Sequence, residues 1–544
     1  MKAFVDLLQE VCKGEVKEDE RTRSLYARDA SLFEVKPRAV IFPSDVEDIK
    51  HLVSFVNERK DLNLSLTCRG GGSDMTGGPL SESIVLDMNR SFQRIKEIGE
   101  DTVIVEPGLW YRDLEKELDR KNLLLPCYPA SKHFCTVGGM VANNAGGEKS
   151  LLYGKTDAYV TKLKAVLADG NEYEIRPLFK QELEEKMKLQ SFEGDLYRNM
   201  WQLITGNKDV LAKAKPNVSK NSSGYALWNV WNGEVFDLTK LFTGSQGTLG
   251  IITEITFRLV KKTKERKLLV VFLPSLDPLT EISKPLLALK PESLELYDDQ
   301  TLKMAVKFFL DFRKILKLDV LSLLIRFLPE FFMVLQGKSP KLIVLAEFTG
   351  TTKREVENLA NKAQEAIQPF GVTSIIAKDE GEAQKYFAIR RESFNLLRKH
   401  VKGMRTANFI EDVIVRSDRL EEFLPRFNKI LSEYPEIIHT LAGHLGDGNL
   451  HMIPLMNLAD PKVRGVIPKV ADRIFKLTLE FGGSFSAEHG DGIIRTPYLE
   501  MMFGKEVCEL FAKVKTLFDP SSIFNPGKKV GGSLEYAMSH IAPH

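Results

Sequence analysis

The sequence predicts an α+β protein with two successive domains, and three observations support this. Segments with strand and helix periodicity alternate from Pro37 onward. Glycine-rich passages follow several of the expected strands. Near residue 265 the glycine density falls and a second α+β region begins, which runs to about residue 500 and precedes a turn-rich tail, "FDPSSIFNPGKK". This tail could fold back onto the first domain.

The first domain follows a charged helical segment and contains two similar strand–helix–strand units. In the first unit, the helix should begin at Ser44, with Glu47 in the capping-box position three residues later. The expected helices are at 44–60 and 111–121, and the expected strands at 38–43, 62–68, 83–88, 102–108, 123–127, 160–175 and 242–260. The glycine-rich passages lie between these strands.

Composition and charge limit the classes of function. Lys plus Arg (76) nearly balance Asp plus Glu (74), which argues against nucleic-acid binding. The five cysteines, at positions 12, 68, 127, 135 and 508, show no CxxC spacing. They indicate reduced thiols of a cytoplasmic protein and supply no iron–sulfur cluster. The N-terminal segment acquires acidic residues early and lacks a long apolar core, which is not typical of a signal peptide.

The segment 302–337 departs from this ordinary composition. Its apolar residues are large, its cations outnumber its anions, and Pro329 divides it. It carries too many charges to span a bilayer. Two interpretations remain open: an amphipathic helix on a membrane surface, or a helix packed on its own domain.

Two glycine-rich passages, 69–78 and 129–160, suggest a ligand that carries phosphate groups. Without a Cβ, glycine lets backbone N–H groups approach an anion closely. The first passage, "RGGGSDMTGG", lacks the following helix of a dinucleotide-binding βαβ unit and the GK[ST] of a Walker loop. One such run alone would indicate a flexible turn. Two runs, together with "GSQGTLG", favour a large diphosphate ligand.

A hairpin is expected at "GHLGDGNLH", residues 443–451, because Asp447-Gly448 is a typical two-residue turn between apolar runs. In that register His444 lies directly opposite His451, with Cβ atoms roughly 4.5–5.5 Å apart on one face. Two imidazoles at that distance can share a metal ion. A pair of half-buried turn histidines is the alternative.

In combination, these motifs resemble the FAD-linked D-2-hydroxy-acid dehydrogenases, which include D-lactate dehydrogenase, the glycolate oxidase flavin subunit and D-2-hydroxyglutarate dehydrogenase. This family lies within the vanillyl-alcohol-oxidase and p-cresol-methylhydroxylase (PCMH) flavoproteins. The resemblance extends from "YARDAS" near residue 26 to the tail ending at 529. It rests on "RGGGSDMTGG", "CTVGGMVANNAGG", "GSQGTLGIITE", "GHLGDGNLH", "AEHGDG" and "NPGK".

The resemblance implies a PCMH-type FAD-binding domain of two subdomains at 36–262, after an N-terminal helical segment at 1–35. An α+β substrate (cap) domain with an antiparallel sheet would follow at 263–530, including 302–337, with a tail at 531–544. The C-terminal segment would return to the FAD domain.

The resemblance also implies which residues bind FAD. The matching positions are Arg69, Gly70, Gly71, Gly72, Ser73, Thr76, Gly77, Pro129, Thr136, Gly138, Gly139, Asn143, Gly146, Gly147, Gly250, Ile251 and Asn525. Some relatives attach FAD covalently through a histidine where this chain has Ser73. Non-covalent FAD is therefore expected.

In the metal-containing members, His444, His451 and Glu488 match the ligands of a divalent metal, usually zinc, and His489 matches the general base. Two imidazoles and one carboxylate leave a coordination position open for the substrate hydroxyl, whose pKa a cation lowers. His489 could then accept the proton while a hydride moves from Cα to flavin N5.

The carboxylate-binding arginine of the family aligns best with Arg390, with Arg391 as the competing choice. A guanidinium can hold a carboxylate bidentately. Successive helical residues point about 100° apart, so only one of the two is expected to face the site.

Three family contacts for a second substrate carboxylate are apolar here: Phe394, Ile410 and Ile453. An unpaired buried carboxylate is costly, so the pocket should favour an apolar monocarboxylate, such as lactate or a longer 2-hydroxy acid.

Larger relatives continue into an iron–sulfur domain that this sequence lacks. We therefore expect the electrons to pass to a quinone or to a separate iron–sulfur or other electron-transfer protein. The expected location is the cytoplasm, with peripheral attachment to the inner face of the cytoplasmic membrane and a homodimer as open alternatives.

Three other functions compete with the dehydrogenase. They are a flavin-dependent transferase resembling alkylglycerone-phosphate synthase, a metal hydrolase using His444, His451 and Glu488, and a flavin subunit that only docks within a redox complex.

Overall fold

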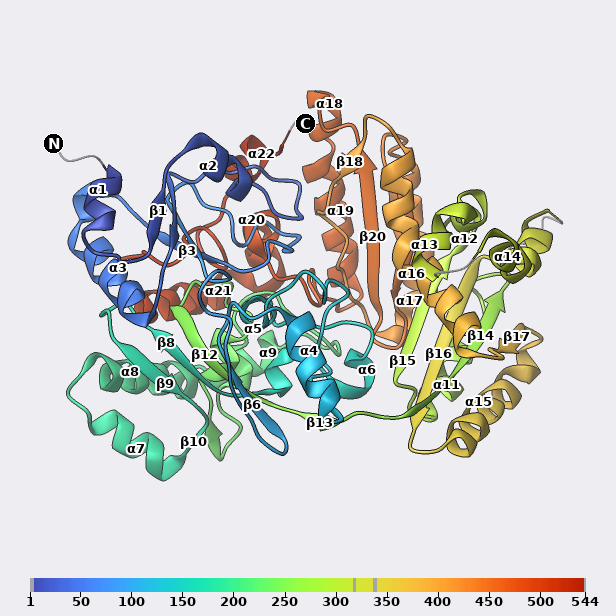
Figure 1. The fold of residues 1–544 in the computed structure, drawn as a ribbon, viewed down its shortest axis with the longest axis horizontal. Helices are drawn as coiled ribbons and strands as arrows, with labels where there is room; N and C mark the ends of the chain where they lie inside the picture. Colours follow the sequence, from blue (N-terminus) through green and yellow to red (C-terminus); the bar gives the residue numbers. More distant parts are fainter. Residues whose placement is uncertain (1–3, 317–318, 336–339, 543–544) are drawn as a thin grey trace.

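Three larger β-sheets organise the chain (Figure 1). The structure is a computed structural model that describes residues 4–316, 319–335 and 340–542. Two sheets belong to the N-terminal half. The third sheet has seven strands and forms a separate block on the right of Figure 1.

The first sheet has four strands in the order β1 (Glu15–Lys17), β2 (Ala39–Phe42), β4 (Ile84–Asp87) and β3 (Leu66–Arg69). Strands β2, β4 and β3 run parallel. Helix α3 (Val46–Glu58) buries Ile49, Leu52 and Val53 against this sheet. The expected Ser44 cap is wrong, because Asp45 is the N-cap and its carboxylate accepts from the Asp48 N–H.

The second sheet is antiparallel, and helix α21 (Leu499–Phe518), from near the C-terminus, packs into its core. Val507, Leu510 and Phe511 of α21 share one buried cluster with residues of this sheet. The strands, in spatial order, are β5 (Ile95–Ile98), β6 (Thr102–Val105), β12 (Ile251–Arg258), β8 (Val160–Val166) and β9 (Glu172–Ile175). The covering helices include α4 (Tyr111–Arg120), α7 (Lys180–Lys188), α8 (Phe192–Gly206) and α9 (Lys208–Ala214).

The tail after α21 fastens two glycine-rich loops to each other. The buried Asn525 amide donates to the carbonyl oxygens of Gly78, at 2.9 Å, and Gln246, at 2.7 Å. The Asn525 side-chain oxygen lies 3.1 Å from Thr67 Oγ1. The C-terminal segment thus returns to the first domain, as expected, because its polar groups satisfy buried loop carbonyls.

The third sheet is antiparallel, as predicted, and helices cover both of its faces. Alternate residues of β14 (Glu265–Leu273) point to opposite faces. Leu269 and Val271 pack with α11 (Leu279–Ala288) and α15 (Lys353–Ile367), whereas Leu268 and Val270 pack with α12 (Asp299–Lys307), α14 (Val320–Leu335) and α16 (Glu380–His400). The other strands are β17 (Thr373–Ile376), β16 (Leu342–Gly350), β15 (Ser293–Asp298), β19 (Ile438–His444), β20 (Asn449–Met456) and β18 (Arg405–Thr406).

The hairpin of β19 and β20 exists, but its predicted register is wrong. His444 pairs with Asn449, and His451 pairs with Ala442. The loop therefore has four residues, closed by the Gly448 N–H donating to the His444 and Leu445 carbonyls. His444 and His451 become diagonal neighbours, which still point to the same face because side-chain direction repeats every two residues.

The helices of segment 302–337 pack one side on the third sheet, and residues 317, 318, 336 and 337 of this segment lie outside the described residues. Leu323 and Phe327 of α14 are fully buried beside Phe312 of α13 (Phe312–Leu316). Among the residues that the structure describes, no helix combines the length and apolar character needed to cross a membrane.

The Asn525→Ala variant should melt several degrees below the wild type. Loss of the Asn525 amide leaves two buried carbonyl oxygens without their hydrogen-bond donor, which lowers the free energy of unfolding by about 2 kcal/mol. Thermal unfolding monitored by circular dichroism tests this. Asn199→Ala removes an exposed Asn whose amide bonds only within its own helix, and it is the matched control. Equal melting temperatures for the two variants would contradict the anchoring role.

Candidate active site

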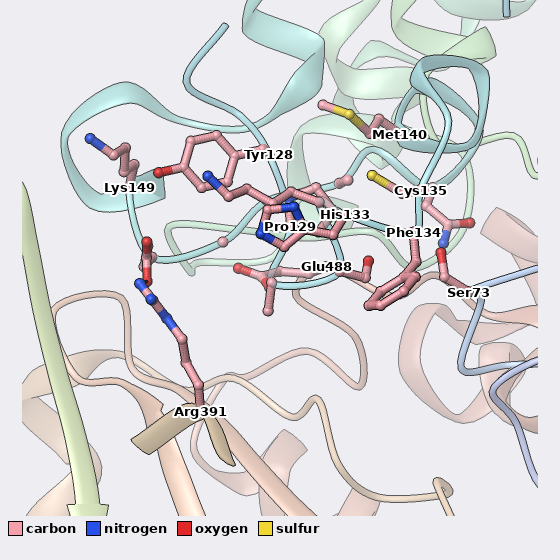
Figure 2. A pocket seen from close by; sticks show the side chains of 18 of the residues that line it. Ser73, Tyr128, Pro129, His133, Phe134, Cys135, Met140, Lys149, Arg391 and Glu488 are labelled. Atoms are coloured by element: carbon pink, nitrogen blue, oxygen red, sulfur yellow. Dashed lines mark hydrogen bonds and ion pairs between the residues drawn. The ribbon is translucent and has the colours of Figure 1, made fainter. Parts of the chain in front are cut away.

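One large cavity, about 1100 Å³, brings the two halves of the sequence together. The glycine-rich loops line it from the first domain, and α16 and the β19–β20 hairpin line it from the second. Figure 2 shows Ser73 and Phe134 at one end, Lys149 and Arg391 at the other, and Glu488 between them. The volume is at the upper end for ligand sites, and it suits a dinucleotide together with a small substrate.

Most of the expected site residues lie on this cavity. They are Gly70, Gly71, Gly72, Ser73, Pro129, Thr136, Gly139, Asn143, Gly146, Gly147, Arg390, His444, His451, Glu488 and His489. The remaining ones are outside its lining: Arg69, Thr76, Gly77, Gly138, Gly250, Ile251 and Asn525. Arg69, for example, donates to the Tyr26 and Arg28 carbonyls instead.

Glycine is required where the two glycine-rich passages touch. A Cβ on Gly70 would lie 2.1 Å from Thr136 Oγ1, and one on Gly71 would lie 2.0 Å from the Phe134 carbonyl oxygen. Both distances are far below contact, so any larger residue would push the loops apart. The loops thereby form a cradle lined by backbone, which fits the diphosphate of FAD.

His444, His451 and Glu488 form a cluster whose ligand atoms all lie within 4.8 Å of one another. His444 Nε2 is 3.5 Å from Glu488 Oε1, and His451 Nε2 is 3.9 Å from Glu488 Oε2. Two imidazoles and a carboxylate are a donor set that suits zinc or a similar divalent cation. The cluster therefore fits the expected metal.

Glu295 on β15 links this cluster to Arg390. Its carboxylate accepts from His444 Nδ1 at 2.7 Å and pairs with the Arg390 guanidinium. The contact leaves His444 Nε2 directed at the cluster, as carboxylate–histidine pairs do at metal sites. Arg390 Nε is buried and has no hydrogen-bond partner among the described residues, which leaves it available to a ligand carboxylate.

His489 is held by two buried acids. Its Nδ1 lies 3.1 Å from Glu411 Oε1, and its backbone N–H donates to Asp412 at 2.9 Å. Burial lowers the pKa of His489, but Asp412 and Glu411 more than offset this and raise it to about 9. With Nδ1 occupied, Nε2 is the nitrogen left to exchange a proton with a ligand.

Lys220, a residue of the first domain, pairs with two buried acids next to the histidines. Its Nζ lies 2.5 Å from Glu488 Oε1 and 3.1 Å from Asp447 Oδ2. Burial alone would raise the pKa of Glu488, but Lys220 and His444 hold it well below its usual value. Glu488 is therefore an ionised carboxylate, the form that binds cations.

Arg390 and Arg391 both line the cavity. Their directions do differ. Arg391 pairs with Glu148 at 2.5 Å across the domain boundary, whereas Arg390 lies beside Glu295 and His444. The cavity is large enough for α16 to face two parts of it.

The three apolar substitutions have different surroundings. Ile453 lines the cavity, whereas Ile410 is fully buried in the core of the second domain and is outside the cavity lining. The side chain of Phe394 lies outside the described residues. Ile453 is therefore the residue on which the expected preference for an apolar substrate side chain depends.

Sequence reasoning missed Glu295, Glu411, Asp412 and Lys220 as site residues. Glu411 and Asp412 lie in the "EDV" stretch, and Lys220 precedes "NSSGY". An acid amid an apolar strand was the only signal for Glu295, because "SLELYD" places it among buried residues.

Two family profiles match most of the chain. The profile described as "FAD binding domain" matches residues 37–176, and "FAD linked oxidases, C-terminal domain" matches residues 262–529. The chain belongs to the FAD-linked oxidase family. The glycine cradle and the cavity that joins it to the second domain agree with this membership.

Several curated dehydrogenases and oxidases are similar to this chain. D-2-hydroxyglutarate dehydrogenase of Escherichia coli (strain K12) is 28% identical over 534 residues, which are 96% of this chain and 51% of that protein. The chain thus spans about half the length of that relative. Glycolate oxidase subunit GlcD of Bacillus subtilis (strain 168) is 29% identical, covering 93% and 92% of the two chains. D-lactate dehydrogenase of Archaeoglobus fulgidus is 28% identical, covering 91% and 93%.

Solved structures share the fold. 4-Ethylphenol oxidase from Gulosibacter chungangensis superposes with a TM-score of 0.69 at 17% identity, covering 98% of this chain and 97% of that one. An alkyldihydroxyacetonephosphate synthase gives 0.65 at 15%, covering 96% and 85%. The chain therefore has the PCMH-type FAD-binding fold with an FAD-oxidase C-terminal domain.

The Glu295→Gln variant should lose about 10- to 100-fold in kcat/KM, because it weakens the orientation of both His444 and Arg390. Turnover with the best 2-hydroxy acid, together with the affinity of the apoprotein for zinc, tests both contacts. The control is Glu281→Gln, an exposed acid in the same domain. Unchanged kcat/KM and zinc affinity would exclude the linking role of Glu295.

Proposed function

We propose that this chain is an FAD-dependent dehydrogenase that oxidises a D-2-hydroxy monocarboxylate to the 2-oxo acid. One observation carries the proposal: the His444–His451–Glu488 cluster, His489 and Arg390 open onto the same cavity as the glycine cradle. The names of the similar proteins are compatible with hydroxy-acid oxidation. The preference for the D stereoisomer comes from the resemblance.

Each residue has a distinct role in this proposal. Arg390 binds the substrate carboxylate through its buried guanidinium. His444, His451 and Glu488 hold a divalent cation, such as zinc, next to the substrate hydroxyl. Non-covalent FAD supplies the hydride acceptor, and the cation supplies the charge that lowers the hydroxyl pKa. The neutral form of His489 takes the hydroxyl proton as the Cα–H bond breaks, and its raised pKa of about 9 makes that form predominant only at alkaline pH.

The cavity favours an apolar substrate side chain. Ile453 and Ala442 line it close to the histidine cluster, on the same hairpin. A second substrate carboxylate placed there would be buried without a partner from these residues, which is unfavourable by several kcal/mol. Lactate and longer 2-hydroxy acids fit this surface better than 2-hydroxyglutarate.

The two electrons would leave to a quinone or to a separate electron-transfer protein. All five cysteines are free thiols, and three of them are buried. This supports the proposed location in the reducing cytoplasm.

Anaerobic addition of one D-2-hydroxy monocarboxylate should bleach the visible flavin band of the purified protein. We expect D-lactate or a longer D-2-hydroxy acid to react at least about tenfold more efficiently than D-2-hydroxyglutarate, because a buried unpaired carboxylate is penalised. Stopped-flow absorbance for each acid and its L isomer measures this. A yellow protein that none of these acids bleaches would favour the transferase or docking functions instead.

Removing the metal should abolish substrate-dependent bleaching. A chelator or His444→Ala is expected to lower the rate by about 100-fold or more, because the hydroxyl proton then has no cation to acidify it. Metal content by elemental analysis and single-turnover rates are the measurements. His439→Ala is the matched control, since His439 lies on the same strand but outside the cavity lining.

Full activity in the chelated protein or in His444→Ala would contradict the metal role. It would leave the histidines as an electrostatic cluster around Glu488.

A further inference from the structure

Helix α14 exposes a continuous apolar face. Leu321 is 67% exposed and Leu335 80% exposed, and large apolar residues lie between them at spacings of three and four. The exposed set is Val320, Leu321, Leu324, Ile325, Leu328, Phe332 and Leu335. At 100° per residue, these seven positions occupy an arc of roughly 140° on one side of the helix.

The opposite side of α14 is already packed, so this apolar face is not needed for the core. Leu323 and Phe327 are fully buried in the cluster beneath the third sheet. Glu330 is also buried, and it accepts from Lys385 Nζ at 2.7 Å and Tyr386 Oη at 2.8 Å on α16. These contacts fix the rotation of α14 about its axis and hold the apolar arc outward.

The position of α14 leaves that arc open to a large partner. Figure 1 shows α14 at the outer end of the second domain, remote from the first domain. Leu310, which is 56% exposed on the neighbouring turn, extends the apolar surface. Contiguous apolar surfaces of this kind are rare on monomeric proteins and mark contact with another apolar body.

The exposed charges of the helices that pack against α14 favour an anionic partner. Lys307 on α12 and Arg313 on α13 are exposed, and both helices pack against α14. The acids of the same region are engaged elsewhere: Asp311 pairs with Lys399, Asp319 caps the first turn of α14, and Glu330 is buried. Self-association through this face would bring like charges together, whereas an anionic surface would pair them.

We propose that the apolar face of α14 docks the protein on the surface of an anionic phospholipid bilayer. A 16-residue helix is about 24 Å long, too short to cross a bilayer, and its one-sided apolar arc suits a position parallel to the membrane surface. Lys307 and Arg313 would contact the anionic headgroups. The inference rests on α14 and its neighbours and does not depend on the proposed reaction.

Docking on a membrane would also bring the cavity close to one of the two expected electron acceptors, a quinone. Helix α16 contacts α14 through Lys385 and lines the cavity through Arg390, only five residues later. If the proposed dehydrogenase activity is correct, α14 would bring the enzyme to the phase in which a lipid-soluble quinone resides.

Co-sedimentation of the purified FAD-loaded protein with vesicles tests the proposal without substrate. The wild type should bind vesicles containing phosphatidylglycerol more tightly than vesicles of phosphatidylcholine alone, and salt should weaken the difference. The triple variant Leu321→Ser, Leu324→Ser, Leu328→Ser should bind at least about tenfold more weakly. Lys307→Gln with Arg313→Gln should remove the preference for phosphatidylglycerol.

The matched control replaces three exposed leucines of other regions: Leu25→Ser, Leu189→Ser, Leu534→Ser. It should bind vesicles like the wild type, and all variants should keep the wild-type circular dichroism spectrum. Equal vesicle binding by the wild type and the α14 variant would overturn the proposal, as would a wild type that binds neither vesicle. Loss of a dimer in the α14 variant, without vesicle binding by the wild type, would instead identify a self-association surface.

Discussion

Buried charges that hold one another fix the geometry of this site. Glu295 pairs with both His444 and Arg390, and Lys220 pairs with Glu488. Leaving one of these charges buried without its partner would cost several kcal/mol, so each side chain has a single favourable position. The same pairing places an arginine and an ionised carboxylate, Glu488, within one cavity, which is the arrangement needed to bind an anion and a cation side by side.

The Lys220–Glu488 pair also crosses the boundary between the domains. Lys220 comes from the first domain, and the hairpin histidines come from the second. The segment that carries Glu488 is fastened to the first domain, because Lys155 Nζ donates to the Ala487 carbonyl and Lys529 pairs with Asp491. The cluster therefore forms only where the domains meet, and the returning C-terminal segment is part of that junction.

The orientation of helix α14 depends on a different set of buried contacts. One side of it completes the core beneath the third sheet, and the buried Lys385–Glu330 pair sets its rotation. The two interpretations of segment 302–337 were a packed helix and an amphipathic surface helix. The structure combines a packed side with an exposed apolar side. Such an exposed side lowers solubility in water, which is a reason to expect that something covers it.

Local patterns in the sequence determined most strands of the first domain, the glycine loops and the existence of the β19–β20 hairpin. They missed β5, and two expected strands differ: residues 243–250 of the strand expected at 242–260 form turns, and the strand expected at 160–175 is divided into β8 and β9. Periodicity and turn chemistry act over a few residues, so they can be read directly. The hairpin pattern brought His444 and His451 together, and the resemblance added Glu488, which lies 37 positions after His451 in the chain. The register of the hairpin was decided by tertiary contacts, since the Gly448 backbone packs against Val415 too closely for any Cβ and the loop widens to four residues.

The pairing partners were likewise decided only by the tertiary structure. Glu295 lies 149 positions from His444, and Lys220 lies 268 positions from Glu488. No local pattern reports a contact over such separations, because it depends on how the domains pack. The same holds for the exposed side of α14: the sequence determined that the segment was apolar and basic, but only packing on the third sheet decided which of its residues remained in contact with water.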